Sequence, residues 1–448
     1  MHLVIIGNGI AGVTCAQTVR RLRPDARITI VSEESAHHYS RTALMYVYMG
    51  HLRPQDIKPH EDWYWPENRL ELVHATATAL DADQRTVQLS TGHALRYDKL
   101  LLATGSVSRF ANWPGRELEG VQGLYNLPDL DRMERTTRGI QQAVVVGGGL
   151  IGVELAEMLR SRRVAVTMLV RDARYWGSVL PPEEARLVDQ QLEHHHVTVR
   201  YDTELREILG DATGKVRAVV SSAGEEIPCQ WVGLATGVTP NLALARTAPG
   251  LETDRGILVN EFLQTNLPDV YAAGDCAQHL LPAAGEVPVE QLWYTGRMQG
   301  ETVAHTICGQ PVKYNRGPWF NSAKFFDLEY QTYGRVPAGP EAGVSSFYWE
   351  HPNGTAALRI NFQTAVPHAV QGFNNLGLRL RHEVCEKWLR AGTPVQEVLA
   401  QLGAANFDPE FFPQFEPLAL AAFRSQFPDF APVQLRLRKG LLSRLLAR

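Results

Sequence analysis

Residues 1–15 of the chain read MHLVIIGNGIAGVTC. A short apolar strand runs into three glycines with the spacing G-x-G-x-x-G, and a helical pattern follows them. In such a motif the first glycine permits a tight turn, the second lets a pyrophosphate approach the backbone, and the third lets helix and strand pack closely. The helix N-terminus adds unpaired N–H groups and a partial positive charge. The stretch therefore predicts a dinucleotide site formed by Gly7, Gly9, Ile10, Ala11 and Gly12.

The motif occurs a second time in residues 143–156, AVVVGGGLIGVELA. Again an apolar strand precedes the glycines and a helical pattern follows them. One such match is weak, because glycine-rich turns between strand and helix also arise from packing alone. Two matches 140 positions apart, at Gly7 and Gly147, indicate two bound dinucleotides. The second site is expected at Gly147, Gly149, Leu150, Ile151 and Gly152.

Length and composition limit the class of protein. With 448 residues the chain is long enough for several domains, and its net charge of -4 gives no reason to expect nucleic-acid binding. The 5 cysteines form no C-x-x-C pair, which argues against a disulfide framework or a metal site and favours a reducing, cytoplasmic environment. We expect neither a signal peptide nor a membrane span, because no basic leader and no run of about eighteen apolar residues occurs.

Two polar segments follow the first motif. An expected strand over residues 26–31 ends at Ser32, Glu33 and Glu34, where this fold places a carboxylate against the adenosine ribose. Glu33 is the first choice and Glu34 the second, and a solvated loop acid is the alternative. Arg41 is a candidate for a bidentate phosphate contact. After a further strand, Ala103, Thr104 and Gly105 are small enough to lie beside a bound cofactor.

Later motifs, in the same order along the chain, resemble those of the two-dinucleotide flavoprotein superfamily of pyridine-nucleotide oxidoreductases. They are Ala235-Thr236-Gly237 and residues 265–276, TNLPDVYAAGDC. The likeness is best to ferredoxin and rubredoxin reductases and to the flavin part of the nitrite reductase large subunit. It implies FAD at the first motif, NAD(P)H at the second near Thr236 and Gly237, and a return to the FAD domain at Gly274 and Asp275. In that likeness the Asp275 carboxylate accepts a hydrogen bond from the ribityl chain.

The resemblance also suggests residues near the flavin ring. Gln291, Leu292 and Trp293 begin a helix that in relatives aims its N-terminus at the flavin. Trp293 is either beside the ring or a core tryptophan between domains. Glu154 resembles a family glutamate near the flavin–nicotinamide contact, although the lysine that pairs with it in disulfide reductases has no counterpart in the segment RTALMY, residues 41–46.

The second motif also bears on the choice of coenzyme. Its next strand, residues 164–170, ends at Arg171, where NADH-preferring relatives usually place a glutamate. A guanidinium favours a 2′-phosphate, and Arg174 could assist it, so we favour NADPH over NADH. In the alternative, Arg171 points to solvent and either coenzyme binds.

Cysteine is absent from residues 32–53, where the disulfide-reductase branches carry their redox thiols. No other side chain forms a mixed disulfide, so thiol–disulfide exchange at that face is excluded. The leading hypothesis is an enzyme that takes hydride from NAD(P)H onto FAD N5 and passes single electrons to an iron–sulfur or haem protein. The alternatives are an NAD(P)H-dependent quinone or small-molecule reductase or oxidase, and a flavin-binding redox sensor.

The C-terminal third changes in character. Residues 319–334 are expected to form the first strand of a small β-rich domain that in relatives supports a homodimer, and helices follow from residue 378. The last residues combine Arg436, Arg438, Lys439, Arg444 and Arg448 with leucines at helical spacing. Such a tail suits an anionic membrane surface or an acidic electron carrier, or packs on its own domain.

The fold class is therefore α/β, with two Rossmann-like domains arranged as in glutathione reductase and a C-terminal α+β domain. The expected boundaries are residues 1–118 and 245–313 for the FAD domain, 119–244 for the NAD(P) domain, 314–377 for the β-rich domain and 378–448 for the helical extension with its basic tail.

Overall fold

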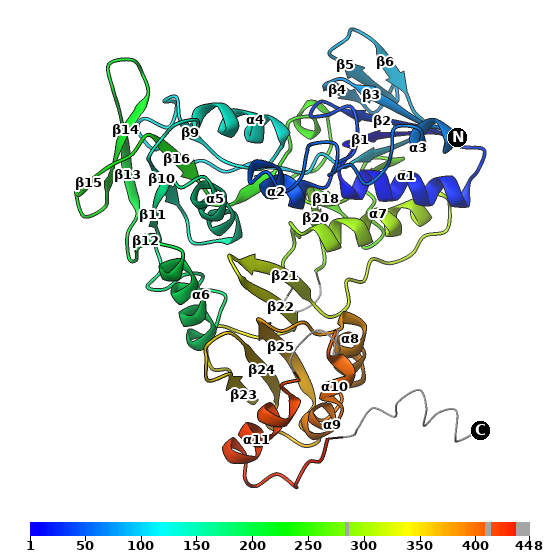
Figure 1. Cartoon of the computed structure of the whole chain (residues 1–448). Helices are drawn as coiled ribbons and strands as arrows, with labels where there is room; N and C mark the ends of the chain where they lie inside the picture. Colours follow the sequence, from blue (N-terminus) through cyan, green and yellow to red (C-terminus); the bar gives the residue numbers. More distant parts are fainter. Residues whose placement is uncertain (283–285, 408–413, 436–448) are drawn as a thin grey trace. The chain divides into compact units, whose positions relative to one another are not determined.

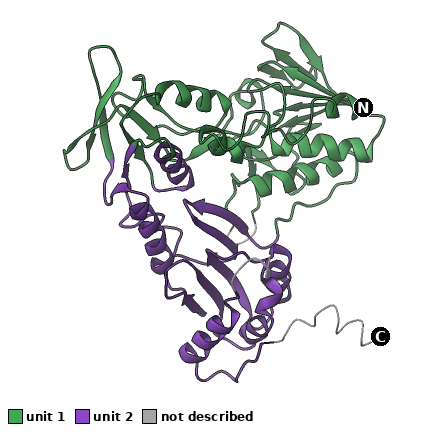
Figure 2. Ribbon diagram, in the orientation of Figure 1, with its two compact units in different colours: residues 1–147, 161–164, 205–316 green, residues 148–160, 165–204, 317–448 purple. Residues whose placement is uncertain are grey.

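The computed structural model of the chain describes residues 1–282, 286–407 and 414–435. The chain divides into two compact units (Figure 2). Unit 1 comprises Met1–Gly147, Ser161–Val164 and Leu205–Arg316, and unit 2 comprises Gly148–Arg160, Ala165–Glu204 and Gly317–Arg448. None of the helices in these described ranges is long and apolar enough to cross a membrane. The basic tail lies outside them.

The centre of unit 1 is a five-stranded parallel sheet (Figure 1). In sheet order its strands are β19 (Val270–Ala272), β7 (Lys99–Leu102), β1 (His2–Ile6), β2 (Arg27–Ser32) and β3 (Leu70–His74). Their side chains are mostly buried, as expected for a parallel sheet covered on both faces. The strand order reverses between β1 and β7, and in open α/β sheets ligands bind at such a switch point.

Two helices that are far apart in the sequence pack side by side in unit 1: α1 (Ile10–Leu22) and α7 (Trp293–Ile307) (Figure 1). Glycines on α7 permit this close packing. A Cβ atom at Gly300 would lie 2.4 Å from the Ala11 carbonyl oxygen, and one at Gly296 would lie 3.2 Å from the Ile10 side chain. Thus the C-terminal part of unit 1 is held against the first glycine motif.

The remaining strands of unit 1 form smaller sheets. They are β4 (Ala77–Asp81), β5 (Thr86–Leu89) and β6 (Ala94–Arg96); β8 (Ser106–Ser108) with β17 (Val238–Pro240); β9 (Val121–Gln122), β16 (Trp231–Leu234) and β10 (Gln142–Val146); β13 (Leu205–Gly210), β14 (Val216–Ser221) and β15 (Glu226–Pro228); and β18 (Ile257–Val259) with β20 (Ala277–His279). Its short helices are η1 (Arg41–Ala43), α2 (Leu44–Tyr48), α3 (Tyr64–Glu67), α4 (Leu127–Thr136) and η2 (Ala245–Thr247).

Unit 2 begins with the helix of the second glycine motif. That helix is α5 (Leu150–Ser161), and it is followed by β11 (Ala165–Leu169), α6 (Pro182–His194) and β12 (Val197–Arg200), with β11 and β12 paired in parallel. Strand–helix–strand units with parallel pairing are the building blocks of dinucleotide folds. The expected mixed α/β class is confirmed in both units.

The C-terminal part of unit 2 is an antiparallel sheet with helices. In sheet order the strands are β21 (Phe320–Phe325), β22 (Leu328–Gly334), β25 (Val370–Leu376), β24 (Ala357–Gln363) and β23 (Val344–Glu350). Four helices follow: α8 (His382–Ala391), α9 (Val395–Ala400), α10 (Leu402–Ala405) and α11 (Glu416–Gln426). The single strand expected over residues 319–334 is in fact a hairpin, which turns at Phe326 with a φ of 56°.

The contact between α7 and α1 gives a test of the fold. We expect Gly300→Ala to lower the free energy of unfolding by about 2 kcal/mol, because the overlap with the Ala11 carbonyl exceeds the gain in helix propensity. Urea unfolding measures the loss. The control is Gly339→Ala, where an added Cβ meets no atom within 4 Å. A Gly300→Ala protein as stable as this control would contradict the packing described.

Candidate functional site

Three loops meet at the carboxyl end of the central sheet of unit 1. Gly7 follows β1, Ala103 follows β7, and Gly274 follows β19. A Cβ atom at Gly7 would lie 2.0 Å from the Ala103 carbonyl oxygen, and one at Gly274 would lie 3.0 Å from the Ala11 Cβ. Residues widely separated in the sequence, and predicted to bind one dinucleotide, are thus brought together at the switch point of the sheet.

The N-terminus of α1 is open toward a ligand. Gly9 is its N-cap and supplies no side-chain acceptor, and Ile10, Ala11 and Gly12 add no acidic group to the first turn. A Cβ at Gly9 would meet no atom within 4 Å, whereas one at Gly12 would lie 2.1 Å from the Gly7 carbonyl oxygen. Free space at the second glycine, crowding at the third and unsatisfied N–H groups together fit the pyrophosphate of FAD.

A chain of hydrogen bonds surrounds Asp275. Gln291 donates to the Ser106 hydroxyl over 2.8 Å, and that hydroxyl donates to the Asp275 carboxylate over 3.0 Å. The Tyr125 hydroxyl, 3.4 Å from the same carboxylate oxygen, accepts a bond from the Ser106 backbone N–H. Burial raises the pKa of Asp275, while the Ser106 hydrogen bond opposes the shift. The carboxylate is therefore held directly by Ser106 and Tyr125, and Gln291 supports it through Ser106.

Thr104 and Gly105, the small residues predicted to lie beside the cofactor, also make specific contacts. Thr104 donates from its hydroxyl to the Asn241 carbonyl over 2.7 Å. Gly105 has a φ of 66°, and a Cβ there would lie 3.0 Å from the Tyr125 hydroxyl. The turn after β7 thus depends on a glycine that also makes room for the tyrosine.

The two acidic candidates for the ribose differ in their surroundings. Glu33 is exposed. Glu34 forms an ion pair with Arg41 at 2.8 Å and accepts a bond from the Leu127 backbone N–H at 3.2 Å. The Arg41 guanidinium also lies 4.4 Å from the centre of the Tyr125 ring. The structure therefore joins Glu34 to Arg41 and leaves Glu33 facing solvent.

His38 is a residue of this site that sequence reasoning missed. Its side chain is 5 % exposed, and its Nδ1 lies 2.7 Å from the carbonyl oxygen of Asn8, inside the first glycine motif. Since a carbonyl only accepts, the ring carries its proton on Nδ1 and donates. Burial lowers the pKa of His38 to about 4, so the imidazole is neutral at pH 7. No sequence pattern indicates this contact, because His38 and Asn8 are 30 positions apart.

The start of α7 is a second helix N-terminus without a side-chain cap. Leu292 is the N-cap and makes no side-chain hydrogen bond to the helix, and its first turn has no acidic residue. Gln291 is exposed, Leu292 and Trp293 are half-buried, and the Trp293 ring lies edge-on to Tyr294 at 5.4 Å.

The second glycine motif repeats the geometry of the first. A Cβ at Gly147 would lie 2.3 Å from the Ala235 carbonyl oxygen, and one at Gly149 would meet nothing within 4 Å. Leu150 begins α5, and neither it nor Ile151 brings an acidic side chain to the first turn, while Gly152 is buried. The residues present fit a second pyrophosphate in the same way.

Three further residues were predicted for the coenzyme site: Glu154, Thr236 and Gly237. Glu154 is half-buried on α5, and burial together with the carboxylate of Glu157 raises its pKa to about 7. In unit 1, the Thr236 hydroxyl donates to the Arg109 carbonyl over 2.9 Å, and Gly237 has a φ of 102°.

Arg171 and Arg174, which follow β11, differ in how firmly their side chains are held. Arg171 is 78 % exposed, and its side chain lies 3.7 Å from Asp172. Arg174 is held by Asp189 at 3.2 Å, and Asp189 also accepts bonds from Tyr175 and Tyr201. Arg171 is the one of the pair that is available to a ligand.

The cysteines form no disulfide in this structure. Cys15, Cys229, Cys276 and Cys385 are buried, Cys308 is half-buried, and all five are free. Burial raises the pKa of the Cys15 thiol far above its usual range. Within residues 1–282, 286–407 and 414–435, no group of three metal-binding side chains comes together.

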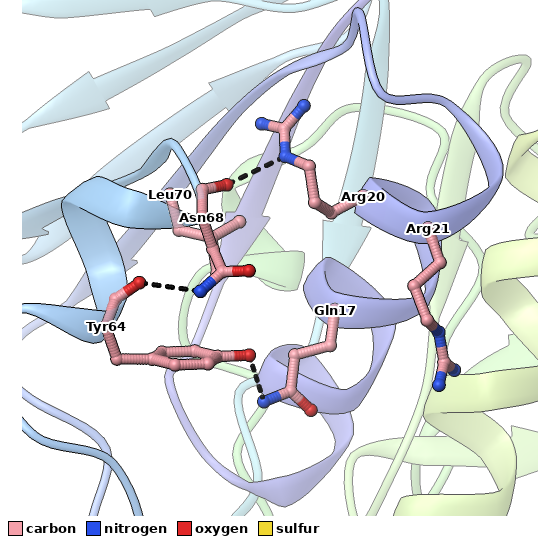
Figure 3. Close-up of a pocket in the computed structure, with 6 residues that line it drawn as sticks. All are labelled: Gln17, Arg20, Arg21, Tyr64, Asn68 and Leu70. Carbon is pink, nitrogen blue, oxygen red and sulfur yellow. Dashed lines mark hydrogen bonds between the residues drawn. The ribbon is translucent and has the colours of Figure 1, made fainter.

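A pocket lies between the second half of α1 and residues 64–70 (Figure 3). It has a volume of about 270 Å³ and is lined by Gln17, Arg20, Arg21, Tyr64, Asn68 and Leu70. The Arg20 guanidinium donates to four backbone carbonyls, among them those of Asn68 and Ala26. These bonds tie α1 to the segment before β3 and identify Arg20 as a structural residue.

A parallel sheet with its glycine turn at the switch point, together with a second glycine turn of similar geometry, is typical of proteins that bind two dinucleotides. Comparison with known families agrees with two dinucleotide sites: residues 1–300, which contain both glycine motifs, match the pyridine nucleotide-disulphide oxidoreductase family. The chain belongs to that family.

Several relatives are known. The assimilatory nitrate reductase electron transfer subunit of Bacillus subtilis is 33% identical over 319 residues, covering 70% of this chain and 40% of the relative. The ferredoxin–NAD(+) reductase component of the biphenyl dioxygenase system of Paraburkholderia xenovorans is 32% identical over 311 residues, covering 69% and 75%. This chain therefore spans less than half of the first relative and three quarters of the second.

The fold extends to the C-terminal sheet in a solved relative. The structure of an NAD-dependent persulfide reductase from A. fulgidus superimposes with a TM-score of 0.81 at 25% identity, covering 98% of this chain and 86% of the other.

The buried His38 gives a test with a pH dependence. Unfolded imidazole has a pKa near 6.5 and the folded one about 4, so between these values only the unfolded chain takes up the proton. Stability is fully present above pH 6.5 and falls as the pH drops toward 4. Between pH 6.5 and pH 5 the loss in the free energy of unfolding that His38 causes is about 2 kcal/mol.

Urea unfolding at pH 7 and pH 5 measures this effect. His38→Gln keeps an N–H donor for the Asn8 carbonyl but does not titrate, so we expect it to lose less stability than the unaltered protein over that range. Equal losses in the two proteins would show that His38 is not the titrating group.

Proposed function

We propose that the protein is an FAD-dependent NAD(P)H oxidoreductase that delivers electrons to a protein-bound one-electron acceptor. The observation that carries the proposal is the pair of glycine turns, each with open space over an uncapped helix N-terminus. A structural flavin alone would not require the second turn. Bound FAD supplies the conversion between a two-electron hydride donor and a one-electron acceptor.

The chain's own residues would serve mainly to bind and orient FAD and the coenzyme. The turn at Gly7–Gly12 would hold the FAD pyrophosphate, and Asp275, fixed by Ser106 and Tyr125, would accept a hydrogen bond from the ribityl chain. The α7 N-terminus would place a partial positive charge near the flavin ring. Few acid–base residues are needed, because catalysis by orientation reduces the barrier once both rings are held in place.

The absence of a cysteine pair supports electron exit directly from the flavin. Four of the five cysteines are buried, all five are free, and residues 32–53 contain none. Relatives named as ferredoxin and rubredoxin reductases support a small iron–sulfur protein as the acceptor class. The alternative acceptor is a quinone.

The coenzyme we propose is NADPH, and Arg171 would bind its 2′-phosphate. The lack of a glutamate at position 171 supports NADPH. The 78 % exposure of the Arg171 side chain and the relatives named for NAD(+) support the alternative, in which NADH also binds. The domain boundaries 119–244 for coenzyme binding and 314–377 for a β-rich domain remain part of this proposal, as does a homodimer formed through the latter.

The first test of the function is anaerobic stopped-flow mixing of the yellow protein with NADPH or NADH. Fast bleaching of the flavin band is expected. Slow bleaching by both coenzymes would contradict an NAD(P)H oxidoreductase and favour a flavin-binding sensor.

Arg171→Glu tests whether Arg171 binds the 2′-phosphate of NADPH. We expect kcat/KM for NADPH to fall about 10- to 100-fold, since a carboxylate repels the 2′-phosphate, while the value for NADH holds or rises. Arg255→Glu makes the same charge change at an exposed arginine of unit 1 and is the control. A fall equal for both coenzymes, or no fall at all, would remove Arg171 from the 2′-phosphate site.

Salt dependence distinguishes the two acceptor classes. With a rubredoxin or a [2Fe–2S] ferredoxin as the probe, we expect the reduction rate to fall several-fold between low and high ionic strength, because charged faces guide such encounters. Menadione, a neutral quinone, serves as the control for direct effects of salt on the enzyme. Fast, salt-independent menadione turnover with no reduction of either carrier would favour the quinone reductase.

A further inference from the structure

Tyr175 connects three parts of unit 2 through one buried side chain. It follows β11 by a few residues and has no solvent exposure. Its hydroxyl donates to the carbonyl oxygen of Gly149 over 2.6 Å. Gly149 is the second glycine of the coenzyme motif, the position at which a pyrophosphate approaches the backbone.

The Gly149 carbonyl is the acceptor that opens α5. It also accepts the first helical bond, from the Val153 N–H at 3.2 Å. In a trans peptide the C=O and the next N–H point in opposite directions. Holding the Gly149 oxygen toward the helix body therefore directs the Leu150 N–H outward, as an anion at the helix N-terminus requires.

Tyr175 is itself held at two other points. Its backbone N–H donates to Asp189 on α6 over 3.0 Å. Its ring lies edge-on to Phe325 on β21, with centroids 6.4 Å apart and an interplanar angle of 82°. The ring of Tyr175 thus packs on the C-terminal sheet, and its backbone is bound to α6 of the same unit.

The next residue shows that this turn is strongly constrained. Trp176 has a φ of 55°, a conformation that is unfavourable for an aromatic residue. Its ring packs against both Phe325 and Tyr330, each at 5.6 Å. Such a backbone persists only where the surrounding contacts fix it, and here those contacts come from β21 and β22.

We propose that Tyr175 is a positioning residue for the coenzyme: supported by Phe325 of the C-terminal sheet, it orients the Gly149–Leu150 peptide that binds the NAD(P)H pyrophosphate. The C-terminal sheet then contributes to coenzyme affinity without touching the coenzyme. This inference rests on the proposed function, since it assigns the second glycine turn to NAD(P)H.

The test is Tyr175→Phe, which keeps the ring and its packing but removes the donor. We expect the Kd of NADPH from stopped-flow reduction of the holoenzyme, with NADH measured in parallel, to rise about three- to tenfold, the effect of one lost hydrogen bond. The limiting rate at saturating coenzyme and the FAD content should not change. If Tyr175 had only a structural role, Tyr175→Phe would lower the thermal stability but leave the Kd of the coenzyme unchanged.

Tyr201→Phe is the matched control. Its hydroxyl donates to Asp189 at 2.5 Å and makes no bond to Gly149, so its loss should leave the Kd unchanged. If Tyr175→Phe does not give a folded flavoprotein, Phe325→Leu loosens the ring while keeping the hydroxyl, and a raised Kd with full FAD content is expected. An unchanged Kd in the folded variant would overturn the proposal.

Failure of this inference is distinguishable from failure of the function. If neither NADPH nor NADH bleaches the flavin of the unaltered protein, the proposed function is wrong. If the unaltered protein is reduced rapidly and Tyr175→Phe binds coenzyme equally well, only the role of Tyr175 is wrong.

Discussion

The close approach of backbone to backbone at the first glycine turn is the constraint on which unit 1 depends. A side chain at Gly7 would overlap the Ala103 carbonyl, and one at Gly300 of α7 would overlap the Ala11 carbonyl. These contacts bring three strand ends and two helix N-termini to one edge of a parallel sheet. Because the first-turn N–H groups of those helices have no side-chain acceptor, the same packing that closes the core leaves a site suited to an anionic cofactor.

Each glycine turn also has a buried side chain that holds one of its carbonyls. In unit 1 the neutral imidazole of His38 donates to Asn8, and in unit 2 the hydroxyl of Tyr175 donates to Gly149. The two donors differ in chemistry and in position relative to their motifs. In each turn, a residue outside the motif therefore donates a hydrogen bond to a carbonyl of the motif.

The sequence predicted what is local and missed what depends on tertiary contacts. The glycine turns, their strands and the parallel α/β class follow from short patterns, and the chain's family membership confirms the resemblance read from them. Tyr125, His38 and Tyr175 were not predictable, because their partners are distant along the chain and no residue pattern marks them. The β21–β22 hairpin was missed because its turn uses Phe326 at positive φ, where a glycine or asparagine would have indicated a turn.

We propose that electrons leave the flavin directly, since residues 32–53, where disulfide reductases carry their redox thiols, contain no cysteine. An anaerobic titration of the purified flavoprotein with NADPH, or with NADH if it reacts faster, tests this by stoichiometry. The account predicts complete bleaching with about one equivalent of coenzyme per FAD, which corresponds to a single two-electron centre. A requirement for about two equivalents would reveal a second two-electron centre in the protein and would contradict it.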